Sequence, residues 1–167
     1  MNTIHEQEYR ITAGDPSYAE AAADLAFESG PEYNSQLFGK AFHRIISRLY
    51  RRKKSYYSYL HSLLALRDRE AAGLLMYTDR EILKKELSYT NFWINLYELP
   101  YLIRQWKSLV HSDKQLDMIK DGECYILYLC VLPGLRSSGI GTALIDHLHK
   151  ISRAGNYTAL SLDVNQE

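Results

Sequence analysis

The sequence has few cysteines, no long apolar run and no excess of charge. Its two cysteines, Cys124 and Cys130, are too few for a disulfide framework, and the even number of positions between them in one expected strand places both on the same face. No stretch approaches the roughly 20 apolar residues of a membrane helix, and residues 1–10 lack the apolar core of a secretion signal. The 20 basic residues balance 20 acidic ones, so no overall field attracts nucleic acid or anionic lipid. These absences predict a cytoplasmic protein with reduced thiols and neither a membrane nor a nucleic-acid partner.

Two local features have both a functional and a structural interpretation. The basic run over 51–54, followed by several tyrosines, suits phosphate contact and base stacking, but positive charge is also favourable at the end of a helix. The neutral overall charge favours the second interpretation. The six histidines show no ligand spacing, and His147 and His149 would point to different sides of one helix, so no metal site is predicted.

A glycine-containing loop near the end of the chain joins two well-patterned segments. Residues 124–131 are apolar or aromatic at every position, which predicts a strand covered on both faces. From Ile140 onward apolar residues return at helical spacing, and Gly155 follows as a stop. Between them, Gly139 and Gly141 let several backbone N–H groups point at one spot where a helix begins. Such a spot favours phosphate.

Three kinds of phosphate-binding loop carry glycines in such a place. A P-loop requires Lys and then Ser or Thr after its last glycine, whereas Thr142 and Ala143 follow Gly141. A dinucleotide fingerprint requires a longer glycine array, and Gly134 lies too far from Gly139. The remaining pattern is Arg-x-x-Gly-x-Gly after a Val-x-Pro that leaves a strand.

The run Arg136-Ser137-Ser138-Gly139-Ile140-Gly141 resembles the acetyl-CoA loop of the GNAT superfamily of N-acetyltransferases. In that family the loop amides cradle the CoA pyrophosphate, and the end of the preceding strand hydrogen-bonds the pantetheine arm. By position, the resemblance implies strand contacts at Leu129, Cys130 and Val131, and a phosphate loop of Arg136, Ser137, Ser138, Gly139, Ile140, Gly141 and Thr142. It is strongest over 123–164 and weaker over 8–77. A glycine turn that only joins a strand to a helix is the alternative.

The resemblance implies an α/β (α+β) fold, with a mixed, mostly antiparallel central sheet flanked by helices and a helical insertion between the third and fourth strands. Residues 1–167 would form one domain. The pattern predicts strands over 8–13, 56–66, 72–77, 124–131 and 159–164, and helices over 19–28, 35–52 and from Ile140 onward, with a turn at 67–70.

Residues 78–122 would be the insertion, where simple family members often have a short turn. The apolar spacing predicts one helix near 82–87 and another over 99–110. The insertion carries a dense set of aromatic residues, namely Phe92, Trp93, Tyr97, Tyr101 and Trp106. These residues either fill core or form the wall of a pocket for an apolar or aromatic acceptor.

Acetyl transfer from a thioester to an amine requires a neutral amine, an oxyanion donor and a proton for the leaving thiolate. Some family members place a glutamate within the strand before the loop. Counting back from Arg136 puts Tyr125 at about that position, and Glu123 lies two residues earlier on the same face. Glu123 is the better candidate for a base, since an ordinary tyrosine pKa is near 10. A solvent-facing glutamate at a strand entrance is the alternative for Glu123.

The chain stops at Glu167, where the family continues with a loop, a helix over CoA and a last pair of strands. A shortened chain, a truncated gene product and a protein completed by a partner are the alternatives. If the chain is complete, we expect the strand over 159–164 to be an uncovered edge, open to a homodimer contact. Two functions remain. One is an N-acetyltransferase that transfers acetyl from acetyl-CoA directly to a primary amine of a small molecule or protein. The other is a non-catalytic CoA-binding or interaction module.

Overall fold

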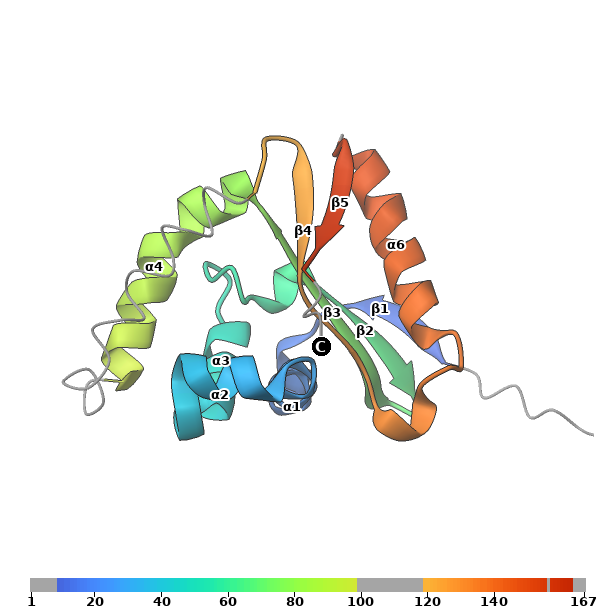
Figure 1. Ribbon diagram of the computed structural model, residues 1–167, viewed down its shortest axis with the longest axis horizontal. Helices are drawn as coiled ribbons and strands as arrows, with labels where there is room; N and C mark the ends of the chain where they lie inside the picture. The colour runs from blue at the N-terminus through green and yellow to red at the C-terminus, as the bar shows by residue number, and fades with distance from the viewer. Residues whose placement is uncertain (1–8, 99–118, 156, 164–167) are drawn as a thin grey trace, which may run out of the picture.

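A computed structural model of the chain describes residues 9–98, 119–155 and 157–163. Five strands form one sheet in the order β1-β2-β3-β4-β5, with antiparallel pairing from β1 to β4 and parallel pairing of β4 with β5. The strands are β1 (Arg10–Ala13), β2 (Ser62–Arg67), β3 (Glu70–Asp79), β4 (Glu123–Val131) and β5 (Ala159–Leu162). The expected mixed, mostly antiparallel sheet is confirmed (Figure 1).

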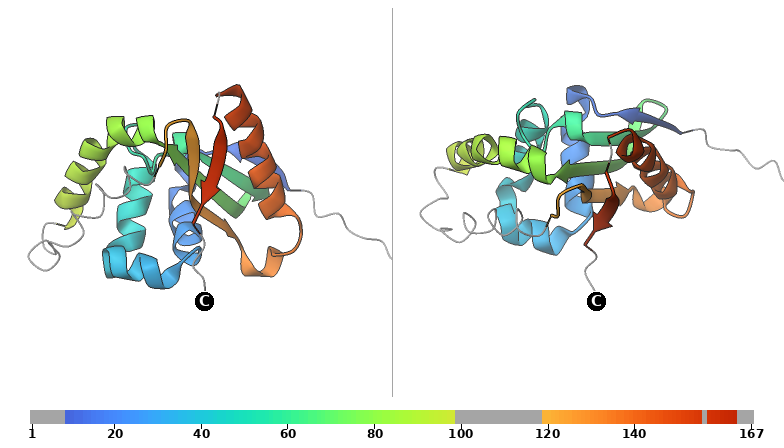
Figure 2. Two further views of the ribbon diagram at one scale, coloured as in Figure 1. Left: turned by 45° about the horizontal axis from the view of Figure 1, so that its top comes forward. Right: turned by 90° about the horizontal axis from the view of Figure 1, so that it is seen from above.

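Helices cover both faces of the sheet (Figures 1 and 2). The helices are α1 (Ala19–Glu28), α2 (Pro31–Phe38), α3 (Phe42–Tyr50), α4 (Arg80–Glu98) and α6 (Ile140–Ala154), with short 3-10 turns η1 (Pro16–Tyr18), η2 (Gly39–Ala41), η3 (Tyr59–His61) and η4 (Pro133–Leu135). Alternation along β2 sends Leu64 and Leu66 toward α1 and α3, and Leu63 and Ala65 toward α6. Two apolar clusters, one on each face, therefore form the core.

Several expected elements have different bounds. The single helix expected over 35–52 is wrong, because Gly39 adopts φ +52 and separates α2 from α3. The strand expected over 56–66 begins only at Ser62. The Ser55 side chain accepts a hydrogen bond from Tyr57 N at 3.1 Å, so the local side-chain bond turns the chain before the strand.

The turn between β2 and β3 is tighter than the expected 67–70. Only Asp68 and Arg69 lie between the strands, with φ of +51° and +68°. Positive φ at both central residues is the geometry of a two-residue hairpin whose twist matches its strands. β3 then continues to Asp79, two residues beyond the expected end at Tyr77.

One extra residue interrupts the pairing of β3 with β4. Met76 pairs with Tyr128 and Tyr77 pairs with Ile126, so Leu127 has no partner on β3. Such a bulge bends the strand and inverts the side-chain alternation beyond it. Even-numbered residues of β4 therefore face α6 before the bulge, whereas odd-numbered residues face α6 after it.

The bulge overturns the expected placement of the cysteines. Cys124 packs in the cluster under α6, whereas Cys130 packs in the cluster under α1 and α3. Both thiols are free and buried. The expectation of a common face is wrong because it assumed strict alternation through the strand.

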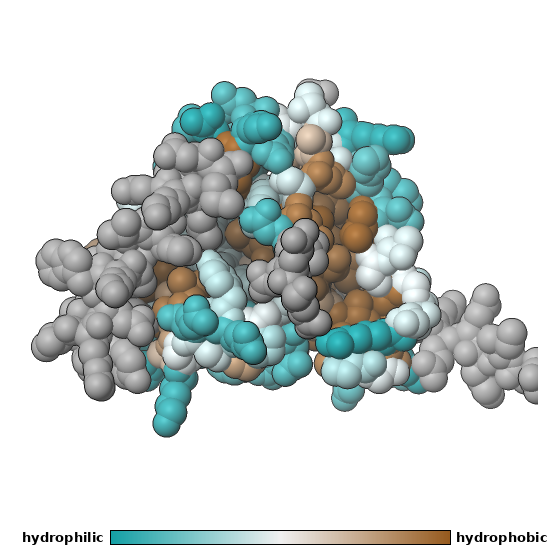
Figure 3. Space-filling model, in the orientation of Figure 1, coloured by the Kyte–Doolittle hydropathy of each residue, from teal (hydrophilic) through white to brown (hydrophobic). Residues whose placement is uncertain are grey.

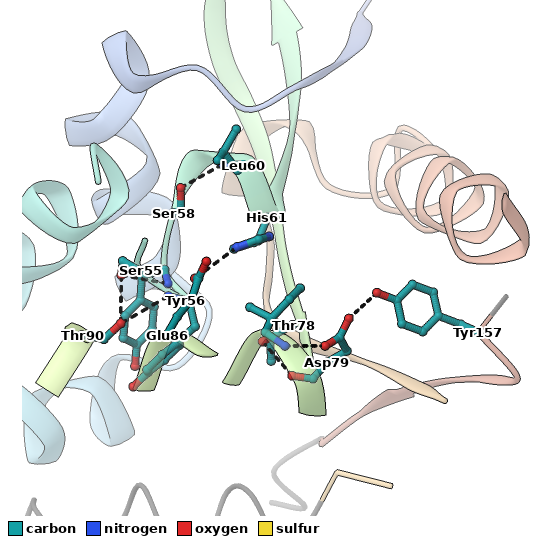
Figure 4. A network of polar contacts seen from close by, with 12 residues as sticks. Ser55, Tyr56, Ser58, Leu60, His61, Thr78, Asp79, Glu86, Thr90 and Tyr157 are labelled. Atoms are coloured by element: carbon teal, nitrogen blue, oxygen red, sulfur yellow. Dashed lines mark hydrogen bonds and ion pairs between the residues drawn. The ribbon is translucent and has the colours of Figure 1, made fainter. Parts of the chain in front are cut away.

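α4 follows β3 directly and is the first of the two helices expected in the insertion. Its N-terminus is capped by Asp79, which accepts from Ile82 N at 2.7 Å and also from the Tyr157 hydroxyl (Figure 4). Glu86 of α4 is paired with His61 at 3.2 Å, with both side chains mostly buried. The second expected helix, over 99–110, lies outside the described residues, as do Tyr101 and Trp106.

The edges of the described sheet are β1 and β5. A homodimer through the β5 edge stays a prediction. Among the helices that are described, none has both the length and the apolar character to cross a bilayer.

Candidate active site

The bulge and the shortness of β5 together open one edge of β4. β5 pairs only with residues 123–126 of β4, and Leu162 is its last paired residue. Beyond that point, residues 128–131 pair with β3 on one side and have no strand beside them on the other within the described part of the chain. A length of β4 backbone is therefore available to an extended ligand.

The loop after β4 is held in a fixed shape by its own hydrogen bonds. Leu135 N donates to Leu132 O at 2.8 Å, Ser138 Oγ donates to Leu135 O at 2.6 Å, and Arg136 Nε donates to Val131 O at 3.2 Å. Ser137 and Gly139 both adopt positive φ, +63° and +85°. These bonds place the loop against the end of β4.

α6 starts immediately after this loop with free donors. Its N-cap residue is Gly139, which has no side chain to bond the first N–H groups. Gly139 O accepts the first helical bond, from Ala143 N at 2.9 Å. The N–H groups of the first turn, together with the positive end of the helix dipole, make a place for an anion.

The two glycines of the motif, Gly139 and Gly141, differ in whether the fold requires a glycine at their position. Gly139 requires its left-handed φ, which L side chains rarely adopt. At Gly141 a Cβ would meet only Val131 Cγ2, at an ordinary 3.8 Å, so protein packing does not demand glycine there. Because packing does not require glycine at position 141, the space left by its missing side chain is available for close approach of a ligand.

Apolar surface borders the open edge. In Figure 3 a brown area extends between β5 and α6 toward the loop after β4. Three large apolar side chains of these elements are exposed, namely Leu132, Ile145 and Leu162. Burial raises the pKa of the Cys130 thiol, Arg136 lowers it and the Glu28 carboxylate raises it, so the thiol stays neutral beside charges of both signs.

A comparison with protein families identifies the family of this chain. The sequence model of the Acetyltransferase (GNAT) family matches residues 24–167. This chain belongs to the GNAT acetyltransferase family.

Solved structures share the fold of this GNAT chain. One described as an acetyltransferase gives a TM-score of 0.65 at 16% identity, over 93% of this chain and 80% of the other. An N-acetyltransferase from Staphylococcus aureus Mu50 gives 0.62 at 18%, over 85% and 75%. A GNAT family acetyltransferase from Brucella melitensis, in complex with acetyl-CoA, gives 0.54 at 17%, over 96% and 78%. No curated protein matches the chain.

The two predicted catalytic residues of this GNAT protein lie in the N-terminal half of β4, which pairs with β5. Glu123 accepts from Lys120 N at 2.8 Å, and the Ser161 side chain first, then that backbone bond, lower its pKa. Tyr125 pairs with Ser161, and its hydroxyl donates to Asp163 Oδ2 at 3.0 Å. Burial, and then the bond to Asp163, raise the pKa of Tyr125, so its phenol stays neutral.

Three further tyrosines pack with Tyr125 in the cluster under α1 and α3. Tyr57 stacks on Tyr128 with ring centroids 6.2 Å apart, and Tyr56 lies 4.3 Å from Tyr57. Burial raises the pKa of Tyr56, Tyr57, Tyr125 and Tyr128, and the Tyr33 phenol of α2 adds to each shift. No local pattern in the sequence predicts this cluster. The 14 tyrosines of the chain are the available signal, but only the tertiary fold brings these four together.

Arg52 of the basic run packs against aromatic residues of α4. The Arg52 guanidinium lies 3.4 Å from the Trp93 ring centroid and donates to Tyr97 Oη at 2.9 Å and Tyr89 Oη at 3.3 Å. Arg51 pairs with Glu20 at 2.9 Å. The two arginines therefore have structural partners. Trp93 and Tyr97 pack against the core cluster under α1 and α3.

The described residues contain no group of three or more His, Cys, Asp or Glu side chains placed to hold a metal ion. The pair of His61 with Glu86 is a two-residue contact between η3 and α4.

Proposed function

We propose that this protein is an N-acetyltransferase that transfers the acetyl group of acetyl-CoA directly to a primary amine of a small molecule or protein. The observation that carries the proposal is the unpaired edge of β4 that leads into the uncapped N-terminus of α6. Acetyl-CoA is the cosubstrate that membership of the GNAT family implies. A fold neighbour in complex with acetyl-CoA supports this assignment.

The proposed donor site follows the chain from strand to helix. Residues 136–142 would hold the diphosphate with backbone N–H groups and the Arg136 charge. Leu129, Cys130 and Val131 would bond the amide groups of the pantetheine arm, as a peptide adds to a sheet edge. The exposed apolar area beside β5 and α6 suits the methylene groups of that arm.

The proposed chemistry requires little from side chains. The amine nitrogen attacks the acetyl carbonyl carbon, the C–S bond breaks, and the thiolate of CoA takes a proton. A backbone N–H near the bulge at Leu127 would stabilise the oxyanion, because bulged backbone is not used by the β3 ladder. Glu123 and Tyr125 stay candidates for handling the amine proton, with Glu123 acting directly or through water.

The test is acetyl-CoA binding followed by turnover. Saturating acetyl-CoA should raise the melting temperature by about 5–10 °C for a ligand at about 100 times its Kd. S-acetyl-pantetheine, which lacks the diphosphate, is the matched control and should stabilise much less. A panel of primary amines should then release free CoA thiol. Absence of stabilisation by both acetyl-CoA and CoA would reject the donor site.

A second function is a CoA-binding module without turnover. The pKa directions favour it: Glu123 is shifted toward a weaker base and Tyr125 toward a weaker acid, opposite to the tuning of catalytic groups near neutral pH. Binding of acetyl-CoA with no thiol release from any amine would select this function.

A further inference from the structure

A carboxylate and a tyrosine meet at the end of β5. Tyr125 and Ser161 are paired across β4 and β5, and Asp163 lies two residues beyond Ser161, so Asp163 belongs to the same face as Tyr125. The Tyr125 hydroxyl donates to Asp163 Oδ2 at 3.0 Å. That bond fixes an exposed carboxylate beside an aromatic ring where β4 and β5 cease to pair.

We propose that Asp163, with the ring of Tyr125, is the acceptor subsite, and that it selects a primary ammonium carried on an apolar or aromatic stem. This inference rests on the proposed function, because it places the acceptor next to the open edge of β4. Asp163 acts here as a specificity residue that holds the ammonium; the proton leaves to solvent before the nitrogen attacks.

The charge distribution favours Asp163 over Glu123 as the anchor. The Glu123 carboxylate is already engaged by Lys120 N at 2.8 Å and carries the electrostatic influence of the Lys120 cation. Asp163 is exposed, and the described residues give it one hydrogen bond, from a neutral phenol. Within the described part of the chain no ion pair engages Asp163, so its charge is open to an incoming ammonium.

The surroundings specify the stem. The Tyr125 ring packs in the apolar cluster under α1 and α3, which also contains Tyr57 and Tyr128. Tyr57 and Tyr128 are buried, and burial keeps their phenols neutral by raising the pKa of both. Electron-rich rings attract a cation and cover apolar carbon, so the subsite suits an amine on an apolar or aromatic chain.

The test compares phenethylammonium with its neutral counterpart phenethyl alcohol. Calorimetric titration of the CoA-loaded protein should show at least tenfold tighter binding of the cation, about 1.4 kcal/mol. Asp163→Asn should abolish this preference and leave stabilisation by CoA unchanged. Asp68→Asn, in the exposed turn between β2 and β3, is the matched control and should retain the preference.

Equal affinity for the two compounds, or a preference that survives Asp163→Asn, would overturn the subsite. So would a failure of both compounds to bind. If CoA itself does not stabilise the protein, the proposed function fails first. Titrating the two compounds without CoA then tests Asp163 by itself, because the compounds differ only in the charged group that would contact its carboxylate. With phenethylamine as acceptor, Asp163→Asn should raise KM about tenfold with little change in kcat.

Discussion

Gly73 of β3 lies directly beneath Ile140, the first residue of α6. A Cβ at position 73 would come within 3.1 Å of Ile140 Cγ2, 3.2 Å of the Cys130 carbonyl oxygen and 3.3 Å of Leu144 Cδ1. The absence of a side chain at one position of β3 therefore sets how closely the start of α6 approaches the sheet.

Gly73→Val should push the first turn of α6 away from the end of β4. Overpacking of this kind costs about 1–3 kcal/mol, and it should also weaken acetyl-CoA because the loop and the strand lose their mutual position. Chemical denaturation and the acetyl-CoA-induced shift in melting temperature measure the two effects. Gly134→Ala is the control, because nothing lies within 4 Å of a Cβ there. Equal behaviour of the two variants would contradict the packing argument.

Gly139 and Gly141 should respond differently to alanine. Gly139→Ala should lower the free energy of unfolding by about 1–2 kcal/mol, because φ is +85° at this position. Gly141→Ala should leave stability unchanged or raise it by about 0.5–1 kcal/mol, since its Cβ meets only ordinary contact and glycine is a poor helix former.

If backbone at Gly141 approaches the diphosphate, Gly141→Ala should nevertheless reduce the affinity for acetyl-CoA. Titration calorimetry of the two variants separates the effects. A stable Gly141→Ala protein with wild-type affinity would remove Gly141 from the proposed diphosphate site.

Asp79 should stabilise the folded state through two hydrogen bonds. Asp79→Ala removes the cap at Ile82 N and the acceptor of the Tyr157 hydroxyl, and should cost about 1–3 kcal/mol. Tyr157→Phe should cost less, and a double-mutant cycle should show that the two losses are not additive. Asp121→Ala is the control: its pair with Arg80 is exposed and should contribute about 0–1 kcal/mol. Additive losses would mean that the two side chains do not interact.

The free energy of unfolding should fall at alkaline pH. Burial raises the pKa of Cys124 from 9.0 to about 12 and that of Tyr50 from 10.0 to about 12. The folded state thus favours the protonated forms: their contribution is fully present below about pH 9 and is lost as the pH rises toward 12. Denaturant titrations should show a loss from Cys124 of about 1 kcal/mol near pH 10.

Cys124→Ala should flatten this pH dependence between about pH 9 and 10, although it lowers stability at pH 7 by leaving a smaller side chain in the core. An unchanged slope in this variant would show that other groups cause the alkaline loss.

The sequence by itself determined the elements whose signals are local. The apolar run ending at Val131, the glycines at 139 and 141, and the helical spacing from Ile140 predicted a strand, loop and helix with nearly the observed bounds. Helix α1 was predicted with its observed bounds, because an apolar stripe and flanking breakers are both encoded within a few residues.

Only the tertiary structure decided how the two halves of β4 face and which side chains meet beside it. The bulge at Leu127 arises from pairing with β3, a strand about 50 positions away in the sequence, and nothing in the run 124–131 marks it. It reversed the face of Cys130 relative to Cys124 and opened the strand edge. Likewise Tyr125 of β4 and Asp163, just after β5, are 38 positions apart, so their hydrogen bond depends on long-range packing that periodicity does not encode.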